Sequence, residues 1–313
     1  MPANTSTPLS DKSKIDYDSN LLLLGSCFAE NIGDKFEYFK FQNSINSFGI
    51  LFHPKAIENL ITHSINRKEY TVADVFFYNE RWHCFDAHSD LSSNDKEELL
   101  TSLNQQVTST KTAIENASHL IITVGTAWVY RFITSNKIVG NCHKIPQKQF
   151  TKELLSVAEV TDSLKNIVSQ VKTINPSVHV IFTVSPIRHL KDGFVENSRS
   201  KAHLTASIHD LITASNGLHY FPSYEIMMDD LRDYRFYTAD MLHPSNIAIH
   251  YIWEQFSQVW IAPNTQHIQK KVDTVQRGLA HRPFNASSEQ HQKFLASLTR
   301  KMEDLEDLHD IRF

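Results

Sequence analysis

Residues 21–30 constrain the fold of this chain more than any other stretch, because a fully apolar run gives way abruptly to helical spacing. The four consecutive leucines at 21–24 are typical of a strand covered on both faces, as in a parallel sheet. Gly25 supplies backbone freedom for a tight turn. Beyond it, apolar residues recur at helical spacing and form one face, namely Phe28, Ile32, Phe36 and Phe39. The stretch therefore predicts a strand, a turn and a helix in direct succession.

Ser26 lies where this strand becomes the helix. A hydroxyl in that place sits among unpaired N–H groups and at the positive end of the helix dipole. Such a setting suits a nucleophile whose attack generates an oxyanion. The other interpretation is an N-cap, which is a very common use of serine. Taken alone, the stretch favours the cap.

A second feature near the other end of the chain changes that balance. Asp240 stands three residues before His243, and Pro244 is typical of the first position of a helix. A carboxylate this close can hold the imidazole in one tautomer and stabilise its protonated form, as a base that activates serine requires. Although this spacing often arises by chance, its combination with Ser26 after the first strand predicts a Ser–His–Asp arrangement.

Apolar runs and helical patterns alternate along the chain. After the first strand, further buried strands are expected at residues 41–45, 120–124, 179–184 and 218–221. This alternation predicts a three-layer α/β/α sandwich around a five-stranded, mainly parallel sheet. Ligands of such sheets bind beyond the carboxyl ends of the strands, where Ser26, Gly125 and Ser185 are expected to lie.

Residues 25–29 read Gly-Ser-Cys-Phe-Ala, and the chain resembles the GSCFA family, a branch of the SGNH (GDSL-like) hydrolases. The resemblance covers roughly residues 20–262, through motifs at 48–49, 123–130, 141–143, 185–189, 221–225 and 233–235. It implies an SGNH-like sandwich with flavodoxin-like strand order. It also implies an enzyme that cleaves or transfers an ester-linked acyl group, such as an O-acyl group on a carbohydrate. Ser26 would be the nucleophile, His243 the general base and Asp240 its orienting acid.

The same resemblance suggests which groups hold the oxyanion. A glycine after the second strand offers its N–H in the SGNH pattern, and Gly49 is the match; the N–H of Ser26 would be a second donor. Many SGNH enzymes then carry Gly-x-Asn-Asp after the third strand, whereas residues 125–128 here read Gly-Thr-Ala-Trp. Either Thr126 or Asn141 is expected to replace the missing amide, and both alternatives stay open.

Three further residues are predicted to wall the substrate pocket. Trp128 suits a pocket wall, although core packing is the alternative. His143 lies in a polar loop at 140–146, where a Cys142–His143 nucleophile pair is disfavoured because adjacent residues of an extended loop point apart. Arg188 either grips an anionic or carbonyl-rich substrate or is simply solvated.

An aromatic-rich, alternating stretch at residues 75–90 predicts a hairpin inserted beside the cleft and turned at Asn79-Glu80. Cys84, Asp86 and His88 would share one of its faces. Without a further spaced pair of ligands nearby, no metal site is expected there. No cofactor is expected either.

Composition excludes several classes of protein. A net charge of −4 over 313 residues gives no basic footprint for nucleic acid. No apolar run approaches the roughly 20 residues that span a bilayer. Residues 1–20 are polar and lack the apolar core of a signal peptide. Three cysteines make no disulfide framework and fit a reducing cytoplasm, which is the expected location.

We expect a polar arm at residues 1–20, a catalytic domain at 21–263 and a helical extension at 264–313. The extension is charged with a thin apolar stripe, so it is expected to pack on the core or to form a homodimer with a second copy.

Two functions follow from the pattern. The preferred one is a hydrolase or acyltransferase acting on a small-molecule or carbohydrate ester, because nucleophile, base and acid are all present. The alternative is a catalytically silent module on the same fold that binds a glycan or an envelope component. The altered Gly-x-Asn-Asp block is the feature that supports this alternative.

Overall fold

The computed structural model describes residues 13–214 and 217–313, so residues 1–12 of the expected arm lie outside the described part. Its centre is a five-stranded sheet whose strands are ordered β10 (Leu218–Tyr220), β9 (His179–Val184), β5 (His119–Val124), β1 (Leu21–Gly25) and β2 (Asn43–Ile45). Every neighbouring pair in it is parallel. The predicted α/β class and flavodoxin-like strand order are both confirmed.

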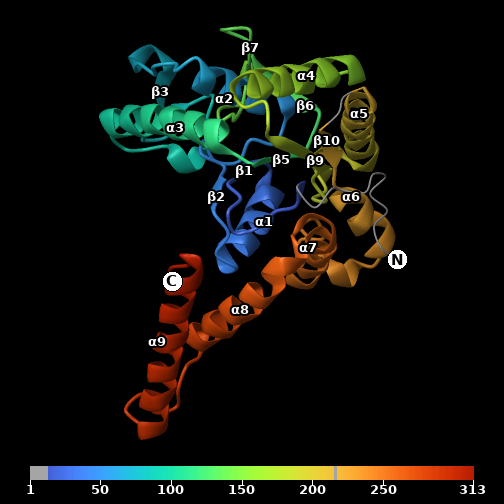
Figure 1. Cartoon of the computed structure of the whole chain (residues 1–313). Helices are drawn as coiled ribbons and strands as arrows, with labels where there is room; N and C mark the ends of the chain where they lie inside the picture. The colour runs from blue at the N-terminus through green and yellow to red at the C-terminus, as the bar shows by residue number, and fades with distance from the viewer. Residues whose placement is uncertain (1–12, 215–216) are drawn as a thin grey trace.

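Helices cover both faces of this sheet and complete the three-layer sandwich (Figure 1). One layer contains α2 (Pro54–Ile65), α3 (Lys96–Asn116), α4 (Val157–Ile174) and α5 (Phe194–Thr213). The other contains α1 (Cys27–Tyr38) and α7 (Asn246–Trp260). Leu22 and Leu24 pack in the first layer, whereas Leu21 and Leu23 pack in the second. The leucine run is continuous because both faces of β1 are buried.

Two small antiparallel sheets are inserted between the main strands. The first is the predicted hairpin of β3 (Val75–Tyr78) and β4 (Arg81–Cys84). Its two turn residues, Asn79 and Glu80, both have positive φ, as a tight hairpin turn requires. The second sheet was not predicted and consists of β6 (Trp128–Phe132), β7 (Lys137–Val139) and β8 (Phe150–Leu154). The two insertions share one apolar cluster.

Short elements complete the body. A short helix, α6 (Ser223–Glu225), continues into a π-helical turn at Ile226–Asp230. Single 3₁₀ turns occur at Val72–Asp74, Ser89–Leu91, Gln147–Gln149, Leu190–Asp192, Tyr234–Phe236 and Pro263–Thr265. Over the described residues, no helix combines the length and the apolar character needed to cross a membrane.

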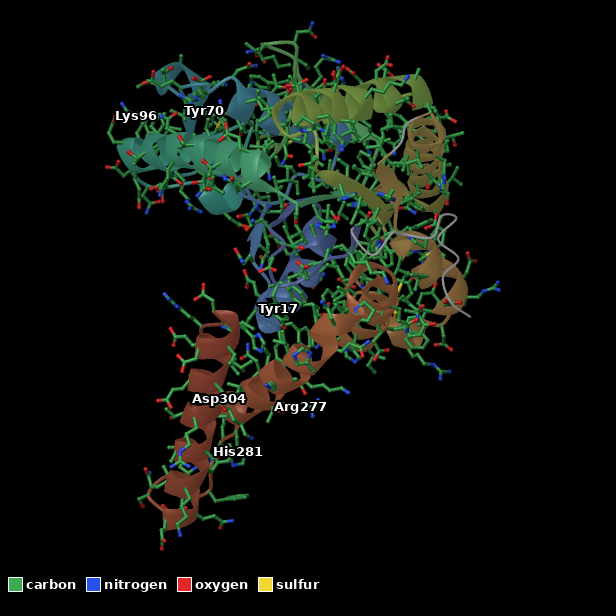
Figure 2. The ribbon with its side chains drawn as sticks, viewed as in Figure 1. Tyr17, Tyr70, Lys96, Arg277, His281 and Asp304 are labelled. Carbon is green, nitrogen blue, oxygen red and sulfur yellow. The ribbon has the colours of Figure 1, made fainter. Side chains whose placement is uncertain are left out.

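The last two helices, α8 (Gln266–Ala280) and α9 (Glu289–His309), form a hairpin that projects from the body (Figure 1). It has an apolar core of its own. The arm is anchored where α1 ends: the Tyr38 hydroxyl donates to Asp273 at 2.8 Å, and Gln276 donates to the Tyr38 carbonyl at 2.8 Å. Tyr17 lies at the same junction, and His281 lies far out at the end of α8 (Figure 2).

The described residues before β1 pack against the body. Ile15 is fully buried and forms a parallel bridge with Ile261, just beyond α7. The Tyr17 ring stacks on Phe41 with ring centroids 4.4 Å apart. This segment therefore belongs to the layer formed by α1 and α7.

Candidate active site

Ser26 occupies the turn between β1 and α1, as the sequence predicts. Its backbone is extended, and its hydroxyl accepts the Phe28 N–H at 3.3 Å, so it caps the helix. The residue is only 2% exposed. Gly25 just before it has φ +138°, and a Cβ there would lie 2.0 Å from the Thr123 carbonyl oxygen. Only glycine fits where β1 approaches β5 this closely.

Asn46 fastens the same turn, and sequence reasoning did not identify it. Its Oδ1 accepts the buried Gly25 N–H at 2.8 Å, and its Nδ2 donates to Glu30 at 3.2 Å. Its own N–H donates to the Leu23 carbonyl at 2.9 Å. The one available signal was an asparagine directly after the second strand. Asn46 therefore sets the path of the chain into Ser26.

Asp240 and His243 form the predicted pair. His243 Nδ1–H donates to Asp240 Oδ2 at 2.6 Å, which leaves Nε2 as the nitrogen that can take a proton. The carboxylate also accepts from the Thr238 hydroxyl at 2.6 Å and from the Leu242 and His243 amides. The hydroxyl and the two amides hold the pKa of Asp240 well below its usual range. Asp240 is therefore a permanent anion that orients the ring.

The turn with this pair lies at the edge of the sheet where β9 ends. The Arg188 N–H donates to the Leu242 carbonyl at 3.4 Å, which ties the turn to the loop after β9. The helices that follow Ser26 and His243 pack together, with the rings of Phe36 and Trp253 5.0 Å apart. Because α1 directly follows β1 and the turn before α7 is tied to the loop after β9, both helices start at the carboxyl edge, near the reversal of strand order where such sheets bind ligands.

The predicted hydrogen bond between Ser26 and His243 is absent from the described residues. Among the described residues, the Ser26 hydroxyl bonds to the Phe28 N–H of its own helix and not to His243. His243 stands on an exposed turn, with 47% of its side chain accessible. The serine is thus held in a capping position while the base faces solvent.

The two backbone amides expected to hold the oxyanion both donate to carbonyls in this structure, and their role as oxyanion donors stays a prediction. The Gly49 N–H donates to the Asn46 carbonyl at 2.6 Å, within a turn where Gly49 has φ +70°. The Ser26 N–H donates to the Thr123 carbonyl at 3.0 Å. Each amide closes a turn that shapes the site, so neither is free in this conformation.

The two alternatives for the third donor differ in what their polar groups contact. Thr126 is buried; its hydroxyl bonds to Ser200 at 2.9 Å, and its N–H donates to the Phe52 carbonyl at 3.1 Å. The hydroxyl and the N–H of Thr126 are therefore both engaged in this structure. Asn141 uses its Oδ1 to accept the His143 N–H at 2.8 Å, while its amide Nδ2 has no partner among the described residues. Asn141 keeps a donor available.

The three residues predicted to wall the pocket have different positions. His143 is buried between the insertions, bonds to the Cys84 carbonyl at 2.7 Å, and has its pKa lowered to about 4 by burial. It secures the two insertions to each other, so its expected place in the pocket wall was wrong. Trp128 donates its indole N–H to the Glu196 carbonyl at 3.3 Å. Arg188 lies beside the His243 turn, 5.9 Å from the Tyr237 ring centroid.

A cavity of about 480 Å³ opens beside the sheet edge, a volume that suits a small ligand. Its lining is mostly apolar, with two lysines among its members: Phe52, His53, Tyr130, Val139, Gly140, Asn141, Cys142, Lys144, Ile145, Pro146, Gln147 and Lys191. Phe52 links it to the strand ends, because its carbonyl accepts the Gly125 N–H at 2.7 Å. Asn141 is the predicted site residue that lines it.

His189 is a second residue that the site adds to the prediction. Its ring lies 5.9 Å from that of Phe52, and a Cβ on Gly125 would lie 3.1 Å from its Nε2. This nitrogen is buried and has no described partner. Burial lowers the pKa of His189 to about 4, so the ring is neutral at neutral pH. Its position in the motif at 185–189 was the only sequence signal.

Within the described ranges, no three His, Cys, Asp or Glu side chains are arranged to hold a metal ion. In the hairpin, His83 instead bonds to the Ser92 hydroxyl at 2.6 Å and the Tyr78 carbonyl at 3.0 Å. Asp86 accepts the Tyr70 hydroxyl at 3.0 Å. These side chains hold the insertion together.

The solved structures that resemble this chain distantly include the following two. One, from Streptococcus pneumonia and described provisionally as a platelet activating factor, is 10% identical, covers 77% of this chain and 83% of its own, and has a TM-score of 0.42. The other is a carbohydrate esterase family 3 structure from Talaromyces cellulolyticus, 8% identical, covering 80% and 98%, with a TM-score of 0.37. No curated protein matches the sequence.

The profile of the GSCFA family matches residues 20–256, and that of the GSCFA domain protein, C-terminal domain, matches residues 272–312. The first match runs from the start of β1 into α7 and includes Ser26, Asp240 and His243. The second covers most of the projecting arm. Since the two matches together account for both the sandwich and its helical extension, this chain belongs to the GSCFA family.

Proposed function

We propose that this protein is an SGNH-type serine hydrolase or acyltransferase that acts on an ester-linked acyl group, with an O-acylated carbohydrate as the preferred substrate. Ser26 is the nucleophile, His243 the general base and Asp240 the residue that orients it. The observation that carries the proposal is the 2.6 Å Asp240–His243 contact, on a turn at the edge of the sheet where Ser26 starts α1. This arrangement presents Nε2 as a base with no further partner in the part of the chain that the structure describes.

The reaction begins with transfer of the Ser26 hydroxyl proton to His243 Nε2. Ser26 Oγ then bonds to the ester carbon, and the carbonyl π electrons move onto the oxygen. Collapse of this oxyanion breaks the bond to the alcohol, which leaves with the proton from His243. Water or a second alcohol then takes the acyl group by the same steps, and Ser26 is regenerated.

Two rearrangements prepare this reaction. Rotation of the Ser26 side chain releases the weak 3.3 Å contact to Phe28 N–H and frees the hydroxyl. The exposed turn at residues 238–243 then closes on it. Met241, at the tip of this turn, already has a positive φ of 61°. Catalytic hydrogen bonds are often long or absent without substrate and form in the complex.

The oxyanion donors we propose are polar groups left without described partners. The amide Nδ2 of Asn141 belongs to the cavity wall, and His189 Nε2 lies against Gly125. Phe52 lines the same cavity as Asn141, and its ring lies 5.9 Å from that of His189. Asn141 and His189 replace the amide that the Gly-Thr-Ala-Trp block lacks. The cavity itself would receive the acyl or sugar part of the substrate.

Hydrolysis of p-nitrophenyl acetate and acetylated sugars by wild type and by Ser26→Ala tests the proposal. Ser26→Ala is expected to lower turnover by roughly 10⁴-fold or more. Ser156→Ala is the matched control, because Ser156 is also an N-cap whose hydroxyl accepts a backbone N–H, at 3.2 Å. Both substitutions should cost about 1 kcal/mol of stability through the lost cap. Equal activity in the two variants would contradict a nucleophilic Ser26.

The silent binding module remains the second candidate, and one observation favours it. The Ser26 hydroxyl lacks a bond to His243, and the Ser26 and Gly49 amides are both occupied. If calorimetry shows a glycan binding while no ester is cleaved, this second function becomes the better account.

A further inference from the structure

Lys201 is a buried cation that takes no part in the proton transfers of the proposed reaction. It lies on α5 and is 2% exposed. Its ammonium group donates to the Gly125 carbonyl at 2.8 Å and to the Ser185 carbonyl at 2.6 Å. These carbonyls belong to the residues that directly follow β5 and β9. Lys201 therefore connects α5 to the carboxyl ends of two central strands.

No carboxylate among the described residues forms an ion pair with this ammonium group. The titratable groups that face it are Cys27 from α1, Tyr224 and Glu225 from α6, and His189 from the loop after β9. The Glu225 carboxylate accepts the Tyr220 hydroxyl at 2.8 Å. Burying a charge without an anionic partner is costly, so a cation kept in this place calls for an explanation.

The position of Lys201 relative to the nucleophile gives that explanation. Gly125 follows β5, and the Ser26 N–H is bonded to Thr123 near the end of the same strand. Burial raises the pKa of the Cys27 thiol, next to the nucleophile, and Lys201 opposes that rise. Its charge therefore acts at the start of α1. In a buried site such a field is much less screened than in water.

We infer that Lys201 is an electrostatic positioning residue: it fixes the strand ends that frame the site and supplies the positive charge against which the oxyanion at Ser26 develops. The inference rests on the proposed hydrolase function and deepens it. Lys201 touches neither substrate nor the reacting atoms. It acts through the Gly125 and Ser185 backbone and through its field. A preorganised charge of this kind lowers the barrier because the oxyanion exists only transiently.

The pH dependence of the rate separates this role from a merely structural one. Burial lowers the pKa of Lys201 to about 7, so the charge is lost within an ordinary assay range. Activity should therefore fall on the alkaline side as the ammonium group deprotonates. Replacing the amine should abolish this fall in the pH–rate profile and lower kcat at neutral pH.

The experiment compares wild type with Lys201→Met and Lys201→Gln in full-length protein, using p-nitrophenyl acetate from pH 5 to pH 10. Lys172→Met is the matched control. Lys172 also donates to two carbonyls, those of Pro176 and Val178, but these lie just before β9, at the opposite edge of the sheet. Burial lowers its pKa as well. Circular dichroism and thermal unfolding establish which variants fold.

The inference predicts that kcat falls roughly tenfold or more in each Lys201 variant that folds, less than the roughly 10²–10³-fold loss of a direct oxyanion donor. KM should stay within about twofold, and the fall of kcat at alkaline pH should disappear. Lys172→Met should keep both the kcat of wild type and its fall at alkaline pH. An unchanged kcat, or a fall at alkaline pH retained in a folded Lys201 variant, overturns the inference.

If neither variant folds, the pH dependence of the wild-type rate still tests the inference. A rate that stays constant from pH 7 to pH 10 overturns it. If wild type shows no esterase activity at all, the proposed function fails together with this inference. If wild type is active and the Lys201 variants have the same kcat and pH dependence, only the inference about Lys201 fails and the proposed function stands.

Discussion

At the scale of single residues, the site depends on side chains that hold a short turn in place as much as on the nucleophile. Ser26 enters its helix through Gly25, whose N–H is bonded to Asn46 Oδ1. His243 is oriented by Asp240, which is itself fixed by Thr238 and two amides. Substitution of Asn46 or Asp240 therefore disturbs the position of a catalytic candidate without removing its reactive group.

Asn46→Ala should lower both stability and activity. The substitution leaves the buried Gly25 N–H without its acceptor, which costs roughly 1–3 kcal/mol. Asn175→Ala is the control, because Asn175 is also buried and donates to two carbonyls, of Ile114 and Ala117, away from the carboxyl edge. Urea unfolding and kcat should show similar instability in both variants but a large loss of kcat only in Asn46→Ala. A kcat unchanged in folded Asn46→Ala contradicts this account of the turn.

His243→Ala should lose most activity, by roughly 10²–10⁴-fold, because the general base is removed. Asp240→Asn should cost less than this, because the ring loses its orienting anion but remains present. Asp233→Asn, which breaks an exposed contact with Arg235, serves as the control. Rates of ester hydrolysis measure the loss of activity in each of the three variants. Full activity in His243→Ala would leave the reaction without its base.

At the scale of elements, buried histidines couple the layers and the insertions. His53 caps α2 by accepting the Ala56 N–H at 3.1 Å, and its Nε2 donates to the Val139 carbonyl of β7 at 3.0 Å. His119 of β5 bonds to the Ser13 carbonyl at 3.1 Å. Burial lowers the pKa of both His53 and His119 to about 4. These rings stay neutral in the folded protein down to mildly acidic pH.

The depressed pKa of His53 predicts a loss of stability in acid. Between about pH 6.5 and pH 4 the unfolded chain binds a proton that the folded chain refuses, so stability falls as pH falls through that window. For His53 the loss is on the order of 3 kcal/mol. Urea unfolding at pH 7 and pH 4.5 should therefore show a smaller difference in His53→Gln than in wild type. His281→Gln, on the exposed arm, should behave as wild type; an unchanged difference in His53→Gln contradicts the assignment.

Elements were predictable to different degrees. The strands β1, β5 and β9 carry long buried apolar runs, so their existence follows from pattern alone. The edge strands β2 and β10 are only three residues long and partly exposed, and it is their place in the alternation of strands and helices that predicts them. The sheet of β6, β7 and β8 was missed because its strands are half-exposed and mix charged with apolar residues. The loop at 140–146, which was expected to form a pocket wall, lies between β7 and β8; most of it lines the cavity, and part of it packs into the insertion.

The site shows the same division. The Asp240–His243 contact follows from local spacing, so it could be predicted. The hydrogen bonds of Gly49, Thr126 and Lys201 depend on residues distant in sequence or on the exact turn geometry, and no local pattern encodes them. Sequence indicates which residues reach the sheet edge. It does not show which of their polar groups are already engaged there.

At the scale of the whole molecule, the arm of α8 and α9 is separable from the sandwich. Its apolar core is distinct from the two clusters of the body. Deleting residues 266–313 should leave kcat within about twofold and lower Tm by a few degrees, because Tyr38 loses its contacts to Asp273 and Gln276. Thermal unfolding and ester hydrolysis of the truncated chain check this. Loss of all activity in a folded truncation would place the arm in the site.

Homodimerisation through this arm stays a prediction. Several apolar side chains on the two helices and their connection are exposed, namely Leu279, Phe284, Phe294, Leu295 and Leu308. Light scattering of the full chain and of the truncated chain should give a dimer and a monomer, respectively. A monomeric full chain would rule out this mode of association at the concentration used.

The measurement that tests the central claim most directly is covalent labelling with a fluorophosphonate, followed by mass mapping of the modified peptide. Such a probe phosphonylates a serine only where a base activates it, so it reports nucleophilicity without knowledge of the substrate. The account predicts one labelled residue, Ser26, with labelling lost in Ser26→Ala and strongly slowed in His243→Ala. An active protein labelled at another residue, or a folded protein that is not labelled at all, would contradict it.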